Sequence, residues 1–161
     1  MRKAAVTTGT VQARTTSHGF WRFSADYLLA AEIAFAQLHD HGHIFFPVLQ
    51  LYATSLELGL KAFLLKRGAT LNQVRALSHN LTNILAEARR RKLGRLVKLD
   101  AREIAAIQIL NLNYASHQLR YIVTGSTKLP QPIYLDRAAR KLVEGLELLC
   151  TGFSGRFKHA A

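Results

Sequence analysis

The residues best suited to chemistry form a polar stripe on a segment that is otherwise apolar. Residues 101–122 carry apolar side chains around most of a helical circumference, and a helix of that kind is buried. One narrow polar stripe stands at i, i+4, i+7 and i+11, and its residues are Asn113, His117, Arg120 and Thr124. An imidazole can transfer a proton near neutral pH, and a guanidinium can hold a phosphate through two hydrogen bonds. With Tyr114 and Tyr121 beside it to stack on a base, the stripe could bind RNA or a nucleotide.

The same stripe also has a structural interpretation. Polar side chains on a buried helix need partners, so Asn113, His117 and Arg120 could satisfy one another and fix the helix register. Two copies of the stripe could instead face each other across a two-fold axis, which predicts a homodimer with His117 and Arg120 in the cleft. The sequence leaves these alternatives open.

The densest basic feature lies at the end of a helix predicted from about Ser78 to a stop at Gly94. It has six cations within ten residues, namely Arg89, Arg90, Arg91, Lys92, Arg95 and Lys98. Such a run would follow a phosphate backbone without reading its sequence. A solvated helix C-terminus also favours cations. Both interpretations stand, although six cations exceed what a helix dipole needs.

Other candidate ligands are weaker. His39, His41 and His43 alternate in one turn, and imidazole suits zinc, copper or nickel, but no cysteine or distant ligand accompanies them. We therefore predict no metal and no cofactor. Cys150, the single cysteine, falls on the apolar stripe of the last predicted helix and is expected to be a buried hydrophobic residue.

The charge balance narrows the class of partner. There are 22 Lys and Arg against 10 Asp and Glu, a formal net charge of +12, which attracts polyanions, with nucleic acid the first candidate. Residues 25–45 differ from the rest, with three acids and no Lys or Arg. The sequence has no glycine-rich phosphate loop, nucleophile elbow or zinc-finger spacing, and its scattered carboxylates disfavour a two-metal hydrolase.

The elements that must position these residues are helices. At 161 residues, 49% of them hydrophobic, the chain has the size of one domain. Apolar residues recur at three- and four-residue spacing, which predicts helices at 27–38, 47–66, 78–93, 101–122 and 135–150. The fold class is therefore an all-α, single-domain antiparallel bundle of about five helices over residues 19–151. A flexible basic N-terminal arm, 1–18, and a short basic tail, 152–161, flank it.

The sequence gives no sign of export or membrane insertion. No apolar segment follows the basic start, and the longest uncharged stretch, around 42–56, is shorter than the ~20 apolar residues that a bilayer crossing requires. With one cysteine and no disulfide, we expect a cytoplasmic protein with no membrane partner.

Several short stretches, taken in order, are similar to one family. Glu57 and Lys61 stand four residues apart, residues 78–81 read Ser-His-Asn-Leu, and Tyr114 and His117 precede Arg120. Alone, Glu57 and Lys61 indicate an ordinary pair on a helix surface, and His79 a capping or packing group. In this order and spacing, over roughly residues 20–150, the chain resembles the HEPN superfamily, small helical bundles of prokaryotic conflict systems and partners of minimal nucleotidyltransferases.

The resemblance implies a dimer and, in many members, a metal-independent ribonuclease. The ribonuclease signature is an arginine followed by a histidine on the fourth helix, with four to six residues between them. Before His117 the corresponding positions are Leu110, Asn111 and Leu112, and no histidine in the chain has an arginine at that spacing. Cleavage needs a proton acceptor and a fixed cation for the developing charge, so the departure bears directly on catalysis.

Three functions are compatible with these features. The first is a HEPN-like module that binds RNA or a partner protein with little or no catalysis, as in a toxin–antitoxin or nucleotidyltransferase-associated system. The second is a divergent endoribonuclease in which Arg120 acts on the other side of His117. The third is a structural partner whose charge matches an acidic protein such as a nucleotidyltransferase.

Overall fold

A computed structural model describes residues 15–119 and 128–153, and every regular element in them is helical. The elements are α2 (Ser17–Ala36), η1 (Gly42–Ile44), α3 (Phe45–Lys66), α4 (Leu71–Ala76), α5 (Leu81–Arg90), η2 (Leu93–Arg95), α6 (Ala101–Tyr114) and α7 (Pro132–Thr151). The all-α bundle is thus confirmed. It has six α-helices in the described ranges where about five were predicted, because α4 is a separate short helix.

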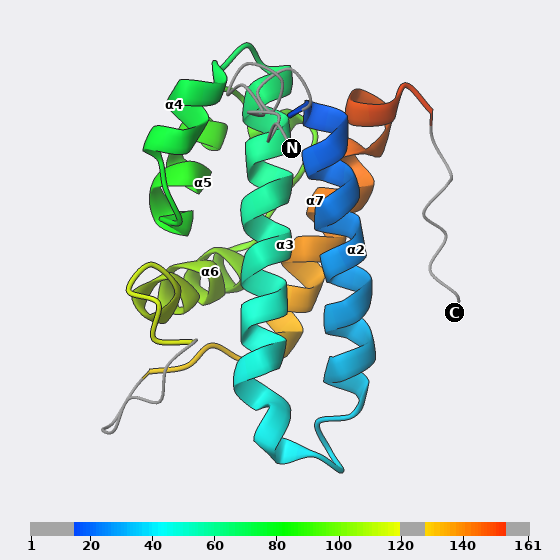
Figure 1. The fold of residues 1–161 in the computed structure, drawn as a ribbon, viewed down its shortest axis with the longest axis vertical. Coiled ribbons are helices and arrows are strands. Elements are labelled where there is room, and N and C mark those ends of the chain that lie inside the picture. The colour runs from blue at the N-terminus through cyan, green and yellow to red at the C-terminus, as the bar shows by residue number, and fades with distance from the viewer. Residues whose placement is uncertain (1–14, 120–127, 154–161) are drawn as a thin grey trace, which may run out of the picture.

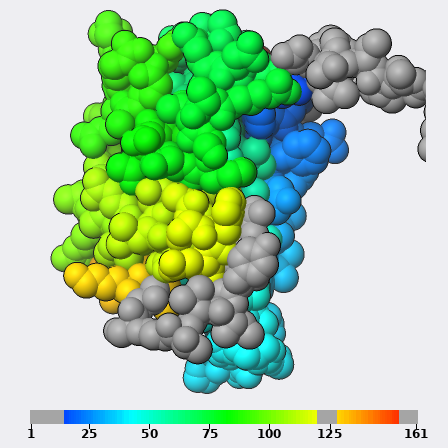
Figure 2. All heavy atoms as spheres, turned by 60° about the vertical axis from the view of Figure 1, so that its left-hand side comes forward, coloured from blue at the N-terminus to red at the C-terminus, as the bar shows by residue number. Residues whose placement is uncertain are grey.

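Three long helices form the centre of the molecule (Figure 1). α3 packs against both α2 and α7, and α2 and α7 also contact each other. The shorter α4, α5 and α6 cover one side of α3, and Figure 2 shows the face that they build, with α6 below α4 and α5. α3 is apolar nearly all round because it has neighbours on nearly all sides.

Small residues allow the central helices to approach closely. A Cβ at Gly59 on α3 would lie 2.7 Å from a methyl carbon of Leu142 on α7 and 2.9 Å from the hydroxyl of Ser24 on α2. At the same crossing the Ser24 hydroxyl donates to the Ser55 carbonyl at 2.7 Å, and the Ser55 hydroxyl donates to the Ser24 carbonyl at 2.8 Å. This crossing sets the position of the residues that follow on α3.

Local capping signals in the sequence are confirmed. Thr70 with Gln73 opens α4, and Asp100 with Glu103 opens α6, each through a complete capping box. α3 ends at Lys66 with Gly68 in the left-handed region, φ +81°, as its terminal sequence predicts.

Three predicted boundaries are wrong. α2 begins at Ser17, capped by the Thr16 hydroxyl, so the bundle starts before residue 19. α5 begins at Leu81, capped by Asn80, and the predicted start at Ser78 lies in a turn. α6 ends at Tyr114, eight residues before the predicted end.

The end of α6 has a defined cause. His117 adopts φ +60°, its N–H bonds the Tyr114 carbonyl at 3.0 Å, and the Gln118 N–H bonds the Asn113 carbonyl at 2.8 Å. These two bonds close a Schellman-type stop in which histidine occupies the position usually held by glycine. Asn113 and His117 of the predicted polar stripe therefore do not lie on one continuous helix.

Among the described residues, one helical stretch, Gly42–Lys66, is long and apolar enough to cross a membrane, with a mean hydropathy of 1.3 over its most apolar part. It is longer than the uncharged stretch around 42–56 because it includes Glu57 and Lys61. In the bundle 72% of the most apolar part is buried. A helix at the centre of a bundle is equally long and apolar, so packing explains the stretch.

Candidate functional site

Among the described residues, one polar cluster contains a histidine and opens on a hollow. A buried carboxylate lies at the centre of this cluster. Glu57 on α3 is only 5% exposed. It accepts hydrogen bonds from Lys61 Nζ at 2.6 Å and from the Tyr114 hydroxyl at 2.6 Å, and His79 Nδ1 lies 3.0 Å from its Oε2. The expectation of a surface pair is wrong, because α4, α5 and α6 cover this part of α3. We call Glu57, Lys61, His79 and Tyr114 the Glu57 network.

The backbone around Ser78 brings His79 to the carboxylate. Ser78 adopts φ +51°, and its carbonyl accepts a second hydrogen bond from Lys61 Nζ at 2.7 Å. The next residues start α5, and the side-chain oxygen of Asn111 on α6 accepts the Leu81 N–H at 2.7 Å. α3, the turn before α5 and the end of α6 are thus joined by polar contacts at one point.

The Glu57 network fixes the ionisation state of its centre. Burial alone would raise the pKa of Glu57, but hydrogen bonds from Lys61, Tyr114 and His79 outweigh it and hold that pKa below its ordinary value of 4.5. An ionised carboxylate can only accept hydrogen bonds, so His79 Nδ1 must carry the proton. In the neutral ring, Nε2 is then left with a lone pair that can accept a proton.

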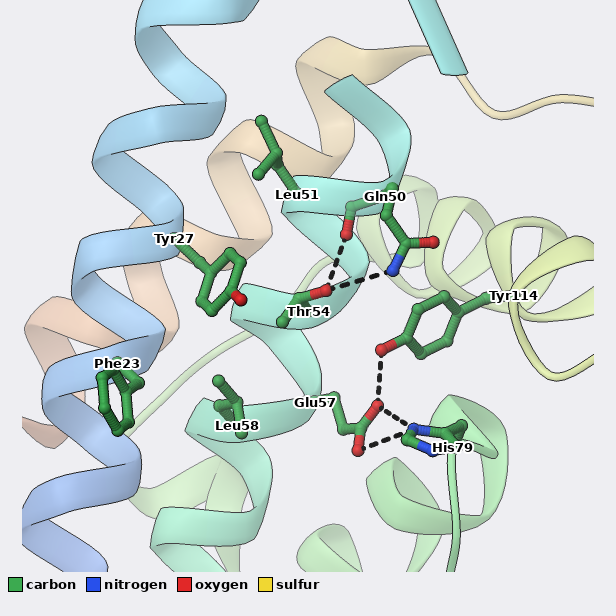
Figure 3. Close-up of a pocket in the computed structure, with 9 residues that line it drawn as sticks. All are labelled: Phe23, Tyr27, Gln50, Leu51, Thr54, Glu57, Leu58, His79 and Tyr114. Carbon is green, nitrogen blue, oxygen red and sulfur yellow. Dashed lines mark hydrogen bonds and ion pairs between the residues drawn. The ribbon is translucent and has the colours of Figure 1, made fainter. Parts of the chain in front are cut away.

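A hollow of about 460 Å³ lies beside the Glu57 network (Figure 3). Phe23 and Tyr27 of α2 line one side of it, and Tyr114 and His79 approach Glu57 from the other. The rest of the lining comes from one face of α3, namely Gln50, Leu51, Thr54, Glu57 and Leu58. Apolar walls with a few polar groups are typical of sites for planar organic ligands.

His117 lies at the edge of this site. Its ring meets that of His79 edge-on, with ring centroids 5.6 Å apart, and His117 itself is exposed. The His79 side chain is 43% exposed. Two imidazoles are therefore accessible side by side, one of them held by a carboxylate, which is an arrangement able to accept and donate protons.

The other members of the predicted stripe lie elsewhere. Asn113 is buried and its amide donates to the Lys128 carbonyl at 3.2 Å. Tyr114 is 4% exposed, so its ring has no free face for stacking on a base, and that prediction is wrong for this residue. Arg120, Tyr121 and Thr124 lie outside the described residues.

The predicted basic run is divided in two. Arg90 and Arg91 bind Glu87 at 2.7 and 2.6 Å, and their hydrogen bonds lower the pKa of that carboxyl to about 2. The remaining four cations are exposed and form no ion pair with any described residue: Arg89, Lys92, Arg95 and Lys98. We call these four the basic cluster.

The other candidate ligands do not converge. Within residues 15–119 and 128–153, His, Cys, Asp and Glu form no group of three that could hold a metal. The rings of His41 and His43 lie 5.7 Å apart in their turn. Cys150 is buried as predicted, and burial raises the pKa of its thiol to about 11.

The Glu57 network was missed as a site, although a signal for it exists. Glu57 and Lys61 are the only Asp, Glu, Lys or Arg residues between Asp40 and Lys66. A lone opposite-charge pair in so apolar a helix is expected to be buried and to need further polar partners. His79 and Tyr114 are those partners, but their distance along the chain hides them.

Comparison with known proteins adds no relative: the chain matches no protein-family model, no curated protein and no solved structure.

Proposed function

We propose that the protein is a HEPN-like module that binds RNA, with an unpaired base in the hollow and the flanking phosphates on the basic cluster. One observation carries the proposal: a buried carboxylate presents His79 at the rim of an aromatic-lined hollow. An aromatic wall can stack on a base, and an imidazole can form a hydrogen bond to its edge. Phe23 and Tyr27 supply the exposed rings, at 60% and 39% exposure.

The placement of charge supports a polyanion as the ligand. The Glu57 network lies at the N-terminal end of α5. The basic cluster lies at and beyond the C-terminal end of the same helix. The ten residues of α5 span about 15 Å, a distance that a few nucleotides of single strand can cover. Ion pairs occupy Glu32, Glu57, Glu87, Asp100, Glu103 and Asp136, which leaves fewer acids to repel a polyanion.

Binding is favoured over cleavage because the arginine of the HEPN ribonuclease signature is absent before His117. Without a fixed cation at that position, the charge that develops on phosphorus in cleavage has no assigned partner among the described residues. A base-binding role needs no such partner.

A second candidate function, metal-independent RNA cleavage, is favoured by the 5.6 Å separation of the His79 and His117 rings. One imidazole would accept the proton of a ribose 2′-hydroxyl as its oxygen bonds phosphorus. The other, protonated, would give its proton to the departing 5′-oxygen. In this version His79, and not Arg120, acts with His117.

Binding is tested by fluorescence anisotropy of a labelled single-stranded RNA over a range of salt concentrations. We expect affinity to fall linearly on a log–log scale, by a slope of about 0.7 for each phosphate contacted. Arg95→Gln should weaken binding and reduce that slope, whereas Arg102→Gln, which removes another exposed cation, on α6, should do neither. No binding at low ionic strength would overturn the proposal.

Cleavage is tested with the same RNA on a denaturing gel in the presence of a chelator. The binding proposal predicts intact RNA with the natural protein and with His79→Gln. Cleavage that is lost in both His79→Gln and His117→Ala, but kept in His43→Gln, would make the second candidate the correct function.

A further inference from the structure

A second hollow adjoins the first one, toward the start of α2. It has a volume of about 340 Å³, and the residues that line it include Thr16, Phe20 and Phe23 of α2, Lys61 of α3, and Val74 and Arg75 of α4. We call it the second hollow, and the hollow of about 460 Å³ beside the Glu57 network the first hollow. Both volumes lie within the range of roughly 300–1,000 Å³ that is usual for sites of small organic ligands.

Phe23 forms the wall between the two hollows. It lines both of them, and it is 60% exposed. Of these two hollows, Tyr27 lines the first and Phe20 the second, and Figure 3 shows Phe23 and Tyr27 one turn apart on α2. Because a helix rises 1.5 Å per residue, the three rings follow one another along one side of α2 in steps of about 4.5 and 6 Å. Such a row offers aromatic faces to successive bases of a single strand.

The ion pair of Glu57 and Lys61 has one member in each hollow. Glu57 lines the first hollow, where it holds His79, and Lys61 lines the second. The Lys61 ammonium has three N–H groups, and in the described part of the chain Glu57 and the Ser78 carbonyl accept two of them. The third N–H therefore remains for an acceptor on a ligand.

The charge of the second hollow suits a phosphate. Arg75 is exposed in the last turn of α4, and none of the residues that line this hollow is acidic. A guanidinium can bind a phosphate through two parallel hydrogen bonds, and the Lys61 ammonium adds a second positive charge. The first hollow differs, since Glu57 lines it and no Lys or Arg does. It therefore suits an uncharged base better than a phosphate.

We propose that the second hollow binds the nucleotide next to the one whose base lies in the first hollow. The Phe23 ring then lies between the two bases, and Lys61 and Arg75 bind the phosphate of the second nucleotide. This inference rests on the proposed binding of RNA and specifies its smallest complete ligand, a dinucleotide with its bases separated. Paired bases in a duplex cannot enter in this way, so the arrangement selects single strands. The basic cluster remains for phosphates further along the strand.

The first test compares one base with two. Adenosine and the dinucleotide pApA are used as competitors of the labelled single-stranded RNA, with fluorescence anisotropy at low ionic strength as the readout. Adenosine can fill one hollow and pApA both, so we expect pApA to bind at least tenfold more tightly. Equal affinities of the two competitors, with the labelled RNA still bound, would overturn this inference and leave the proposed function intact. A labelled RNA that does not bind would overturn both.

Variants show which residues give pApA its advantage. Arg75→Gln should weaken the binding of pApA and leave that of adenosine unchanged, because adenosine has no phosphate. Arg102→Gln is the control for loss of an exposed cation and should change neither. Circular dichroism checks that each variant is folded. An advantage of pApA that is kept in Arg75→Gln, or lost equally in Arg102→Gln, would overturn the inference.

The aromatic wall has its own matched pair of variants. Phe23→Ala should weaken the binding of pApA about tenfold, since the ring would stack on both bases. Phe46→Ala removes another exposed phenylalanine, 46% exposed at the start of α3 and outside both hollows, and should have no effect. Equal effects of the two variants, or no effect of Phe23→Ala, would contradict the inference.

The second test reads the separation of the bases directly. 2-Aminopurine loses fluorescence when it stacks on adenine, so a dinucleotide of the two is dim in solution. If the Phe23 ring separates the bases, this dinucleotide should become brighter when it binds. A bound dinucleotide that stays as dim as the unbound one would show that its bases remain stacked, and would overturn the arrangement.

Discussion

Two buried carboxylates in this bundle are built alike but do different things. Glu57 accepts a hydrogen bond from Lys61, four residues later on α3, and another from the hydroxyl of Tyr114 on α6. Asp136 on α7 likewise accepts a hydrogen bond from Arg140, four residues later, at 2.9 Å. It accepts another from the Tyr52 hydroxyl on α3, also at 2.9 Å. In both places a single acid joins helices through the same pair of donor types.

The third partner makes the difference. Glu57 also holds His79, whose side chain is 43% exposed and faces the hollow. At the other cluster Arg140 continues to Glu32 at 2.9 Å, which closes the chain of contacts between α7 and α2. Burial and the nearby Asp136 raise the pKa of Tyr52 well above its ordinary value, so this hydroxyl stays protonated. Glu57 thus presents an imidazole at the hollow, whereas Asp136 joins α7 to α2.

Removing the charge of Glu57 should have the largest effect on stability. Glu57→Gln leaves Lys61, which is 7% exposed, as an unpaired buried cation, and we expect a loss of about 3–5 kcal/mol in the free energy of unfolding. Urea denaturation measures it. Glu57→Gln with Lys61→Met should recover much of the loss, and equal losses in the single and double variants would contradict this reason.

Removing the tyrosine hydroxyl at the closed cluster should have a moderate effect on stability alone. Tyr52→Phe leaves a buried oxygen of Asp136 with one donor fewer, at a loss of about 1–3 kcal/mol. RNA affinity should be unchanged. His79→Gln should show the reverse, with near-natural stability and weakened RNA binding. If the two variants changed the same quantity, the distinction between the clusters would fail.

The dependence of stability on pH should show a smaller contribution from Glu57. Its pKa in the folded protein lies below the ordinary 4.5, so the stabilisation is present above that pH and is lost as the pH falls toward the folded-state pKa. Urea midpoints measured from pH 6 downward should therefore fall less steeply for Glu57→Gln than for the natural protein. Parallel curves would show that Glu57 titrates alike in the folded and unfolded chain.

The sequence predicts features that depend on neighbours along the chain. The capping boxes at Thr70 and Asp100 and the glycine stop at Gly68 act within one helical turn, and all three are confirmed. The core faces of α5 and α7 also follow from spacing alone, since their predicted apolar residues Leu81, Ile84, Leu142 and Leu146 are fully buried.

Features that depend on contacts across the chain were missed. Glu57 and His79 are 22 residues apart, and Glu57 and Tyr114 are 57 apart, so no local pattern joins them. The end of α6 was missed for a related reason. A histidine in place of the usual glycine gives no stop signal in the sequence.

That histidine has a consequence for how the protein would respond to selection for thermostability. A non-glycine residue in the left-handed region is strained by roughly 1 kcal/mol, so His117→Gly should raise the melting temperature by a few degrees. The same change removes the ring that lies against His79. A screen that rewards heat resistance alone would therefore discard a side chain from the edge of the hollow, as in other proteins where stability and activity conflict.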